Sequence, residues 1–150
     1  MTSKSWTVKF NKGDTHKGIK KTNKGKMYIS SPQEIADILK LIPKGKLTTT
    51  KDIAQLLAQR NNADFTCPMT TGIFLSIVAN YYEEQKGKIA QIPYWRVVKQ
   101  HGRLYPKYLG KTLPQKEYLL KENFEIVPNK NHKEPLEVKD WQKYLYDFTK

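Results

Sequence analysis

The stretch that decides the fold of this chain is Ile92-Pro93-Tyr94-Trp95-Arg96-Val97-Val98. It sets two large aromatic side chains, Tyr94 and Trp95, between a proline and an Arg-Val-Val run. A phenol is almost wholly protonated at neutral pH, and an indole has no basic nitrogen. Neither residue can therefore serve as the thiolate or the imidazole of a nucleophilic active site.

Three short helices are predicted upstream of this stretch. The first begins at a capping box, Ser31-Pro32-Gln33-Glu34, in which the serine caps the helix and Glu34 follows three residues later. The second begins at Thr49, with Asp52 at the same spacing, and the third runs from Pro68 to about Tyr82. Apolar residues at helical spacing are expected to face the core: Ile35, Ile38, Leu39 and Ile42; then Ile53, Leu56 and Leu57; then Ile73, Ile77, Val78 and Tyr81.

Three short helices with a tight connection between the second and the third are the outline of a helix-turn-helix. Downstream, Trp95–Val98 and Arg103–Tyr105, separated by a turn at Lys99–Gly102, predict a β-hairpin that would form a wing. The sequence therefore predicts a mainly α fold with a small β-hairpin wing, an α+β domain of winged helix-turn-helix type.

The two ends of the chain are predicted to extend this domain. Residues 1–30 predict a flexible basic arm with one short strand at Trp6–Phe10, where apolar and polar residues alternate. The domain is expected to span residues 31–127 and to include a closing helix over Pro114–Asn123. Residues 128–150 predict a linker and a docking helix, because apolar residues there follow helical spacing: Val138, Trp141, Leu145 and Phe148.

The net charge of +13 is concentrated in two blocks. Residues 1–30 carry eight Lys against one Asp, and residues 86–121 carry nine Lys or Arg against one Glu. Basic blocks on an otherwise near-neutral chain favour contacts with phosphates, because binding releases the counterions of the phosphates. A Lys-rich surface can also serve solubility alone. The second block contains the Tyr94–Trp95 stretch, and this coincidence favours nucleic acid as the partner.

Ile92–Val98 resembles the active-site segment of the alkylguanine-DNA alkyltransferases (methylated-DNA–protein-cysteine methyltransferases), which is Ile-Pro-Cys-His-Arg-Val-Val in that family. Ile42–Thr49 resembles the family's Ile-Pro-x-Gly-x-Val-Thr/Ser segment, and Gln115–Glu122 resembles its closing Leu-Leu-x-x-Glu helix. The resemblance runs from about Ile42 to Ile126 and implies the DNA-binding domain of the family. The chain has no room for the amino-terminal domain of many alkyltransferases. In this it is similar to the alkyltransferase-like proteins, which replace the Cys and flag alkylated bases for other repair proteins.

The resemblance fails at the residues that carry the chemistry of the family. Tyr94 stands at the position of the alkyl-accepting Cys, and Trp95 at the position of the His that activates it. The Tyr that helps rotate the target nucleotide out of the duplex falls at Thr50. The Arg that fills the vacated base position falls at Thr70 or Thr71. The resemblance therefore implies a DNA-reading fold without catalytic residues, metal or cofactor.

Two kinds of candidate site residue follow. Helix N-termini near Thr49 and retained basic residues such as Arg96 can meet phosphates, although capping and a structural ion pair explain the same residues. Tyr94 and Trp95 either line a pocket that stacks on a base or fill the former active site. The candidate nucleic-acid-binding residues are Thr48, Thr49, Thr50, Lys51, Thr70, Thr71, Arg96 and Arg103, and the candidate pocket residues are Asn80, Tyr94 and Trp95.

The single cysteine, Cys67, excludes an intramolecular disulfide. It has no neighbouring His in the sequence, so we interpret it as a buried or incidental thiol. No apolar run is long enough for a membrane span, and the first residues lack the apolar stretch of a signal peptide. We expect a cytoplasmic monomer without membrane contact.

The predicted function is non-catalytic binding of duplex DNA, linked to DNA repair, with other repair proteins as further partners. Two alternatives stay open. One is a sensor of alkylated guanine that flips the base into a pocket lined by Tyr94 and Trp95. The other is a protein-interaction module that has lost DNA affinity. An alkyltransferase that uses Cys67 is the least favoured interpretation.

Overall fold

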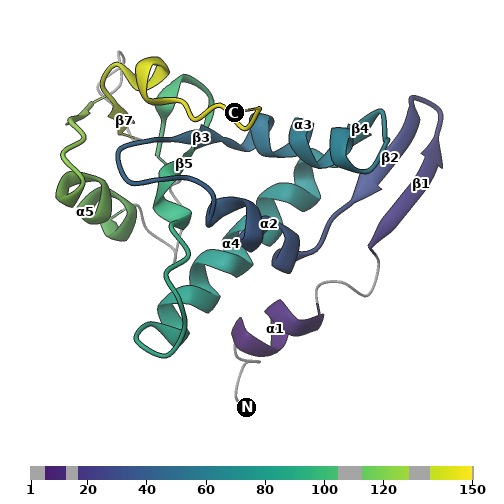
Figure 1. Ribbon diagram of the computed structural model, residues 1–150, viewed down its shortest axis with the longest axis horizontal. Helices are drawn as coiled ribbons and strands as arrows, with labels where there is room; N and C mark the ends of the chain where they lie inside the picture. The colour runs from purple at the N-terminus through teal and green to yellow at the C-terminus, as the bar shows by residue number, and fades with distance from the viewer. Residues whose placement is uncertain (1–5, 13–16, 105–112, 129–135, 150) are drawn as a thin grey trace.

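The computed structural model describes residues 6–12, 17–104, 113–128 and 136–149 and shows a helical body with short strands at its edges (Figure 1). The helices are α1 (Trp6–Lys12), α2 (Pro32–Leu39), α3 (Thr50–Arg60), α4 (Pro68–Gln85) and α5 (Leu113–Lys121). The strands are β1 (Gly18–Thr22), β2 (Gly25–Ile29), β3 (Thr48–Thr49), β4 (Phe65–Thr66), β5 (Val97–Val98), β6 (Ile126–Val127) and β7 (Glu137–Val138). Short 3-10 helices are η1 (Tyr94–Arg96), η2 (Gln100–Gly102) and η4 (Trp141–Tyr144). Within the described ranges, no helix combines the length and the apolar character needed to cross a bilayer.

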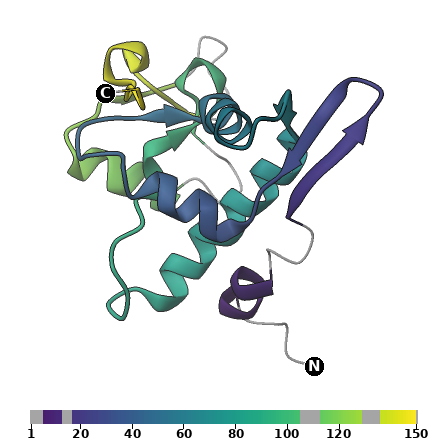
Figure 2. The same cartoon turned by 45° about the vertical axis from the view of Figure 1, so that its right-hand side comes forward.

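Helix α4 crosses the middle of the body (Figures 1 and 2). It packs against α1, α2 and α3, and it also contacts η1. Its buried side includes Leu75, Val78 and Tyr82. The predicted inward stripe is wrong at Ile73, which is 53% exposed. Apolar residues occur on almost every face of α4, so their spacing alone does not single out the buried one.

Both predicted helix caps are confirmed. The Ser31 hydroxyl oxygen accepts a hydrogen bond from the Glu34 backbone N–H at 3.2 Å, at the start of α2. The Thr49 hydroxyl oxygen accepts one from the Asp52 backbone N–H at 3.1 Å, at the start of α3. Each bond satisfies one of the backbone N–H groups that a first helical turn leaves free. The three predicted helices therefore exist in the predicted order.

Strand β5 does not form the predicted hairpin wing, because it pairs in parallel with β3, 49 residues earlier. The side-chain N–H of Gln115 donates to the Val97 carbonyl at 2.7 Å. The turn after β5 closes through a 2.7 Å hydrogen bond from the Lys99 N–H to the Arg103 carbonyl. Tyr105, at the end of the predicted second strand, lies outside the described residues. A hairpin pairs two strands that are close in the sequence. The parallel pairing of β5 with β3 instead depends on parts of the chain that are far apart.

The described N-terminal segment is a helix followed by a hairpin, not a flexible arm. Trp6–Phe10, predicted as a strand, belongs to α1. The Glu84 carboxylate accepts hydrogen bonds from two backbone N–H groups at the start of α1, and the Phe10 ring stacks on Tyr81 with 4.0 Å between centroids. These contacts with α4 stabilise a short helix that local alternation could not predict.

The C-terminal segment packs on the body without the predicted helix. Strand β7 pairs with β6 in antiparallel fashion, and Asp140 then adopts a left-handed φ of 56°, which interrupts any helix before Trp141. Leu47 joins the segment to the body: its N–H donates to the Tyr144 carbonyl and its carbonyl accepts from the Tyr146 N–H, both at 2.8 Å. The domain boundaries at residues 30 and 127 stay a prediction.

Gly102 provides a test of this packing. Its φ is +73°, and a Cβ added to it would lie 2.5 Å from Cγ of Trp141. We predict that Gly102→Ala lowers the free energy of unfolding by more than the backbone cost of about 1–2 kcal/mol, because the indole must also move.

Gly45 is the matched control for this variant, since its φ is +88° and an added Cβ would have nothing within 4 Å. Gly45→Ala should show the backbone cost alone in urea unfolding. Equal losses in the two variants would contradict the close packing of Trp141 on Gly102.

Candidate nucleic-acid interface

Tyr94 and Trp95 are packed inside the body, with 0% and 1% of their surfaces exposed. Trp95 stacks on Tyr118 of α5, with centroids 4.2 Å apart and ring planes 15° apart. Tyr94 meets Trp95 edge-on at 5.4 Å, and Tyr82 of α4 is tilted against both rings. The rings therefore fill the space that the sensor interpretation assigns to a flipped base.

The polar atoms of these rings have hydrogen-bond partners. The Tyr94 and Tyr118 hydroxyls both donate to Glu83 Oε2 at 2.8 Å, and the Trp95 indole N–H donates to Glu122 Oε2 at 2.9 Å. Burial raises the pKa of Tyr94 well above its usual range, and the Glu83 carboxylate raises it further. Tyr94 is therefore held as a neutral phenol, which is a poor nucleophile.

Arg96 is held by Glu122 and by the backbone of Ile42. Its Nη2 and Nε donate to the Glu122 carboxylate at 2.6 and 2.9 Å, and its Nη1 donates to the Ile42 carbonyl at 2.7 Å. The two charged side chains are 7% and 9% exposed. Of the two interpretations that the sequence left open for Arg96, the structure shows the ion pair inside the protein.

Four other predicted site residues are also buried. Thr48 and Thr49 form β3 and are 1% and 6% exposed. Thr71 and Asn80 each donate a side-chain hydrogen bond to the carbonyl four residues earlier, at 2.9 and 2.8 Å. Such local bonds are common for Thr and Asn. The side chains of Thr48, Thr49 and Thr71 do not reach the surface, so they offer no contact of their own to DNA. A phosphate contact through the backbone N–H groups at the start of α3 stays a prediction.

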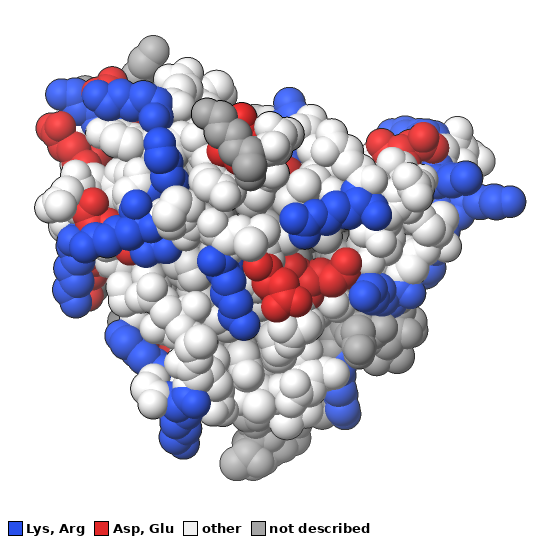
Figure 3. All heavy atoms as spheres, in the orientation of Figure 1, with Lys and Arg blue, Asp and Glu red and all other residues white. Residues whose placement is uncertain are grey.

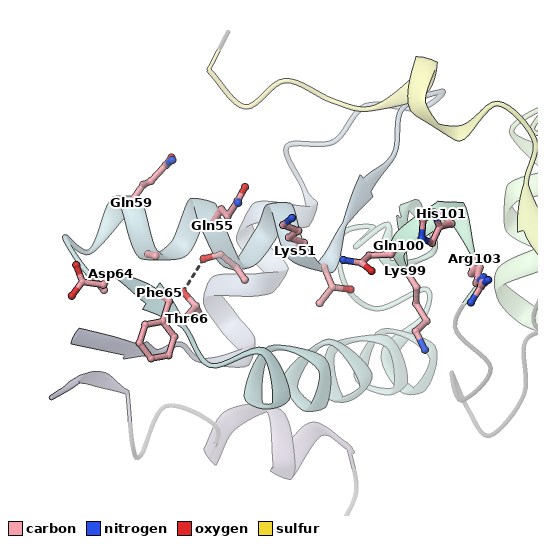
Figure 4. A pocket seen from close by; sticks show the side chains of 14 residues that line it. Lys51, Gln55, Gln59, Asp64, Phe65, Thr66, Lys99, Gln100, His101 and Arg103 are labelled. Atoms are coloured by element: carbon pink, nitrogen blue, oxygen red, sulfur yellow. Dashed lines mark hydrogen bonds between the residues drawn. The ribbon is translucent and has the colours of Figure 1, made fainter. Parts of the chain in front are cut away.

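Thr50, Lys51 and Arg103, also predicted from the sequence, do come together in one groove (Figure 4). The groove has a volume of about 990 Å³. It runs along α3, from Asp64 at one end to the Lys99–Arg103 turn at the other. The parallel pairing of β5 with β3 places this turn beside the start of α3.

The groove is basic. Lys51 comes from α3, whereas Lys99 and Arg103 come from the turn. Asp64 is the single carboxylate among the lining residues, and its Oδ2 accepts the backbone N–H of Lys26 at 2.7 Å. A concave surface with this excess of positive charge attracts phosphates.

Two buried polar atoms of the groove lack a hydrogen-bond partner among the described residues, Thr50 Oγ1 and Arg103 Nε. Buried polar groups in folded proteins almost always have partners, so these two atoms are exceptions. Both are cut off from solvent, and a ligand in the groove could reach them only after neighbouring side chains move.

Amide side chains of the groove were absent from the sequence-based prediction. Gln55 and Gln59 follow Lys51 at intervals of four residues along the exposed face of α3, and Gln100 lies in the turn (Figure 4). The four-residue spacing on α3 is a signal that could have revealed the first two. No sequence signal reveals Gln100, because β5 brings it to α3. Thr70 is not among the groove-lining residues.

Cys67 is remote from the Tyr94–Trp95 cluster. It precedes α4, and Glu83, the partner of Tyr94, lies 16 residues further along, which is about 24 Å at the rise of an α-helix. Burial raises the pKa of the Cys67 thiol, but hydrogen bonds from the first turn of α4 outweigh burial and leave the pKa below its usual value. In the part of the chain that the structure describes, no three His, Cys, Asp or Glu side chains are grouped to hold a metal.

The fold is that of the alkyltransferase-like proteins, as the sequence resemblance implies. It is similar to S. pombe ATL, solved in complex with DNA, with a TM-score of 0.55, 17% identity, and coverage of 77% of this chain and 94% of that chain. It is also similar to S. pombe Atl1, solved in complex with damaged DNA containing O6-carboxymethylguanine, with a TM-score of 0.52, 18% identity and the same coverage. No protein-family model and no curated protein matches the chain.

Removal of the Glu122 carboxylate tests the role of Arg96. We predict that Glu122→Ala lowers the free energy of unfolding by about 3–5 kcal/mol, because it leaves a buried guanidinium unpaired. The double variant Arg96→Met/Glu122→Leu should recover part of this loss, since it removes both charges but leaves the Trp95 indole N–H without its Glu122 acceptor. A loss below about 1 kcal/mol in Glu122→Ala, a value typical of exposed ion pairs, would contradict the buried pair.

The raised pKa of Tyr94 predicts how stability depends on pH. The unfolded phenol ionises near its ordinary pKa of 10.0, whereas the folded phenol stays protonated. This contribution to stability is therefore full below pH 10 and is lost as the pH rises above it. Tyr94→Phe should flatten the decline in the free energy of unfolding above pH 10 by up to about 1.4 kcal/mol per pH unit.

Phe148→Leu, which alters a half-buried residue of the C-terminal segment and removes no titratable group, is the control for this measurement. It should leave the slope unchanged. An unchanged slope in Tyr94→Phe would show that the Tyr94 phenol is not protected in the folded state.

Proposed function

We propose that this protein binds duplex DNA in the groove between α3 and the Lys99–Arg103 turn and performs no alkyl transfer. The observation that carries the proposal is the combination of positive charge and exposed amide side chains in one groove. The fold shared with two proteins solved in complex with DNA supports nucleic acid as the polyanion for this groove.

The groove offers two kinds of contact. Lys51 can meet a phosphate as a point charge at the exposed start of α3. Gln55 and Gln59 each present a donor and an acceptor, which suit base edges and sugars as well as phosphates. Phosphate contacts would hold the protein on the duplex, and amide contacts would adjust its fit to the groove of the DNA.

The proposed absence of transfer chemistry rests on Tyr94 and Trp95. They occupy the positions of the thiol and the imidazole in the resembling family, and both are buried. An indole carries no base, and the pKa of Tyr94 is raised by burial and by Glu83. The lone thiol, Cys67, lies at the opposite end of α4 from the Tyr94 contact.

Recognition of alkylated guanine by base flipping has little support in the described side chains. Extruding a base costs a few kcal/mol, which a receiving pocket and a gap-filling side chain must recover. Tyr94 and Trp95 fill the space for the base, and Thr71 is buried. Thr50 lines the groove, but its side chain is too short to fill a vacated base position. A role in DNA repair, repair-protein partners, a monomeric state and a cytoplasmic location belong to the proposal and rest on the sequence.

Binding to an undamaged duplex across a salt series tests the proposal. The logarithm of the binding constant should fall linearly with the logarithm of the salt concentration, by about 0.9 per phosphate contact. Lys51→Ala should weaken binding and reduce that slope by about 0.9 if Lys51 contacts one phosphate. Gln55→Ala should weaken binding and leave the slope unchanged, because it removes no charge.

Lys40→Ala is the matched control, since Lys40 is exposed at the end of α2 and does not line the groove. Its binding should equal that of the unmodified protein. Absence of duplex binding at low salt would overturn the proposal in favour of a protein-interaction module. Transfer of label from a methylguanine duplex to the protein would overturn the non-catalytic assignment. A preference above tenfold for the damaged duplex, about 1.4 kcal/mol, would favour the sensor.

A further inference from the structure

The hairpin formed by β1 and β2 carries a cluster of exposed lysines. The strands pair in antiparallel register from Gly18↔Ile29 to Thr22↔Gly25. The cluster, named here the hairpin lysines, consists of Lys20, Lys21, Lys24 and Lys26, all exposed. In Figure 3, basic side chains lie on the right of this face of the molecule, with a few acidic ones beside them, where Figure 1 places β1 and β2.

The hairpin is fixed to the body. Strand β2 pairs in parallel with β4, which pairs Met27 with Phe65. At the base of the hairpin, Tyr28 is buried, and its hydroxyl donates to Glu34 of α2 at 2.7 Å. The hairpin therefore holds its lysines in defined positions, unlike a flexible tail.

The hairpin also continues the groove. Phe65 of β4 is one of the groove-lining residues, and so is Asp64, whose carboxylate accepts the Lys26 backbone N–H. Lys26 is one residue from the turn between Thr22 and Gly25, so the groove meets the hairpin near its tip, on the β4 side of the sheet. The hairpin projects from the body (Figures 1 and 2). A duplex that lies along α3 and extends past Asp64 meets the hairpin next.

The charges of the hairpin are arranged at a cost to the folded protein. Lys21 and Lys26 are direct cross-strand partners, and like charges in that position destabilise a sheet. In the described part of the chain, no carboxylate forms an ion pair with any hairpin lysine. A phosphate between the two ammonium groups would remove the repulsion.

Protection of the sheet edge is the simpler explanation for lysines on β1, because β1 is an edge strand and charges on an edge prevent aggregation. It does not account for Lys26, which lies on β2, the central strand of the sheet order β1-β2-β4. Nor does it account for the placement of Lys26 directly opposite Lys21.

We propose that the β1–β2 hairpin is a second DNA-binding element, a wing whose lysines contact duplex phosphates beyond the Asp64 end of the groove. This inference rests on the proposed function, because the groove supplies the primary contact. The predicted wing at residues 95–105 is thereby replaced by a hairpin from the N-terminal segment.

The length of the DNA footprint is the first consequence. Strands β2 and β1 lie side by side outside β4 in the sheet order β1-β2-β4. Two strand spacings of about 4.8 Å each correspond to about three base pairs of duplex at 3.4 Å each. The affinity of the unmodified protein should therefore rise with duplex length until both groove and hairpin are occupied. For Lys21→Gln/Lys26→Gln, the rise should end about three base pairs earlier.

Salt dependence is measured in the same experiment on a duplex long enough to saturate the unmodified protein. Lys21→Gln/Lys26→Gln should reduce the salt slope by about 1.8, or about 0.9 for each lost contact. Lys40→Gln/Lys44→Gln, which removes the same charge at exposed positions outside the groove, should leave footprint and slope unchanged. Thermal unfolding should show that the hairpin variant is as stable as the unmodified protein or more stable, because a repulsion is removed.

The failures of the two proposals are distinguishable. If the unmodified protein binds duplex with a salt-dependent affinity and the hairpin variant keeps the same footprint and slope, the wing is overturned and the groove stands. If the control variant loses as much slope as the hairpin variant, only net charge matters, and the wing is again overturned. If the unmodified protein does not bind duplex at all, the proposed function fails and the wing fails with it.

Discussion

The buried ion pair of Arg96 and Glu122 joins three segments that are far apart in the sequence. The guanidinium binds the carboxylate after α5 and the Ile42 carbonyl after α2, while the same carboxylate accepts the Trp95 indole N–H. A buried charge pair contributes little net stability over apolar packing, but its geometry is demanding, so it fixes the position of η1. Strand β5 follows directly and pairs with β3, and this pairing places the Lys99–Arg103 turn beside α3. The groove therefore depends on the same interaction that closes the core.

Tyr94 and Trp95 are part of the core. Aromatic rings pack around them, and carboxylates satisfy their polar atoms. The outer face of α3 stays exposed. The proposed binding of DNA at the surface of α3 would therefore leave this part of the core undisturbed.

Local features of the fold were predictable, and features that depend on distant contacts were not. The caps at Ser31 and Thr49 follow from side chains three residues from their partners, so α2 and α3 could be located from the sequence. The pairing of β5 with β3 joins residues that are far apart in the sequence. The helix at Trp6–Lys12 likewise depends on a distant residue, Glu84. Within the candidate site, Lys51 was predictable from its place at a helix start. The burial of Arg96 was not predictable, because the sequence around an arginine does not tell whether it pairs with a phosphate or with a carboxylate such as Glu122.

A two-dimensional ¹H–¹⁵N spectrum, recorded as duplex is added, tests the proposal that DNA occupies the groove while Tyr94 and Trp95 stay packed in the core. The account predicts shifts of the backbone signals of Lys51, Gln55 and the Lys99–Arg103 turn. It also predicts that the Trp95 indole N–H signal stays in place and exchanges slowly with water, with undamaged and with alkylguanine duplex alike. Large movement or fast exchange of the Trp95 indole signal on addition of alkylguanine duplex, with the groove signals unmoved, would contradict the account.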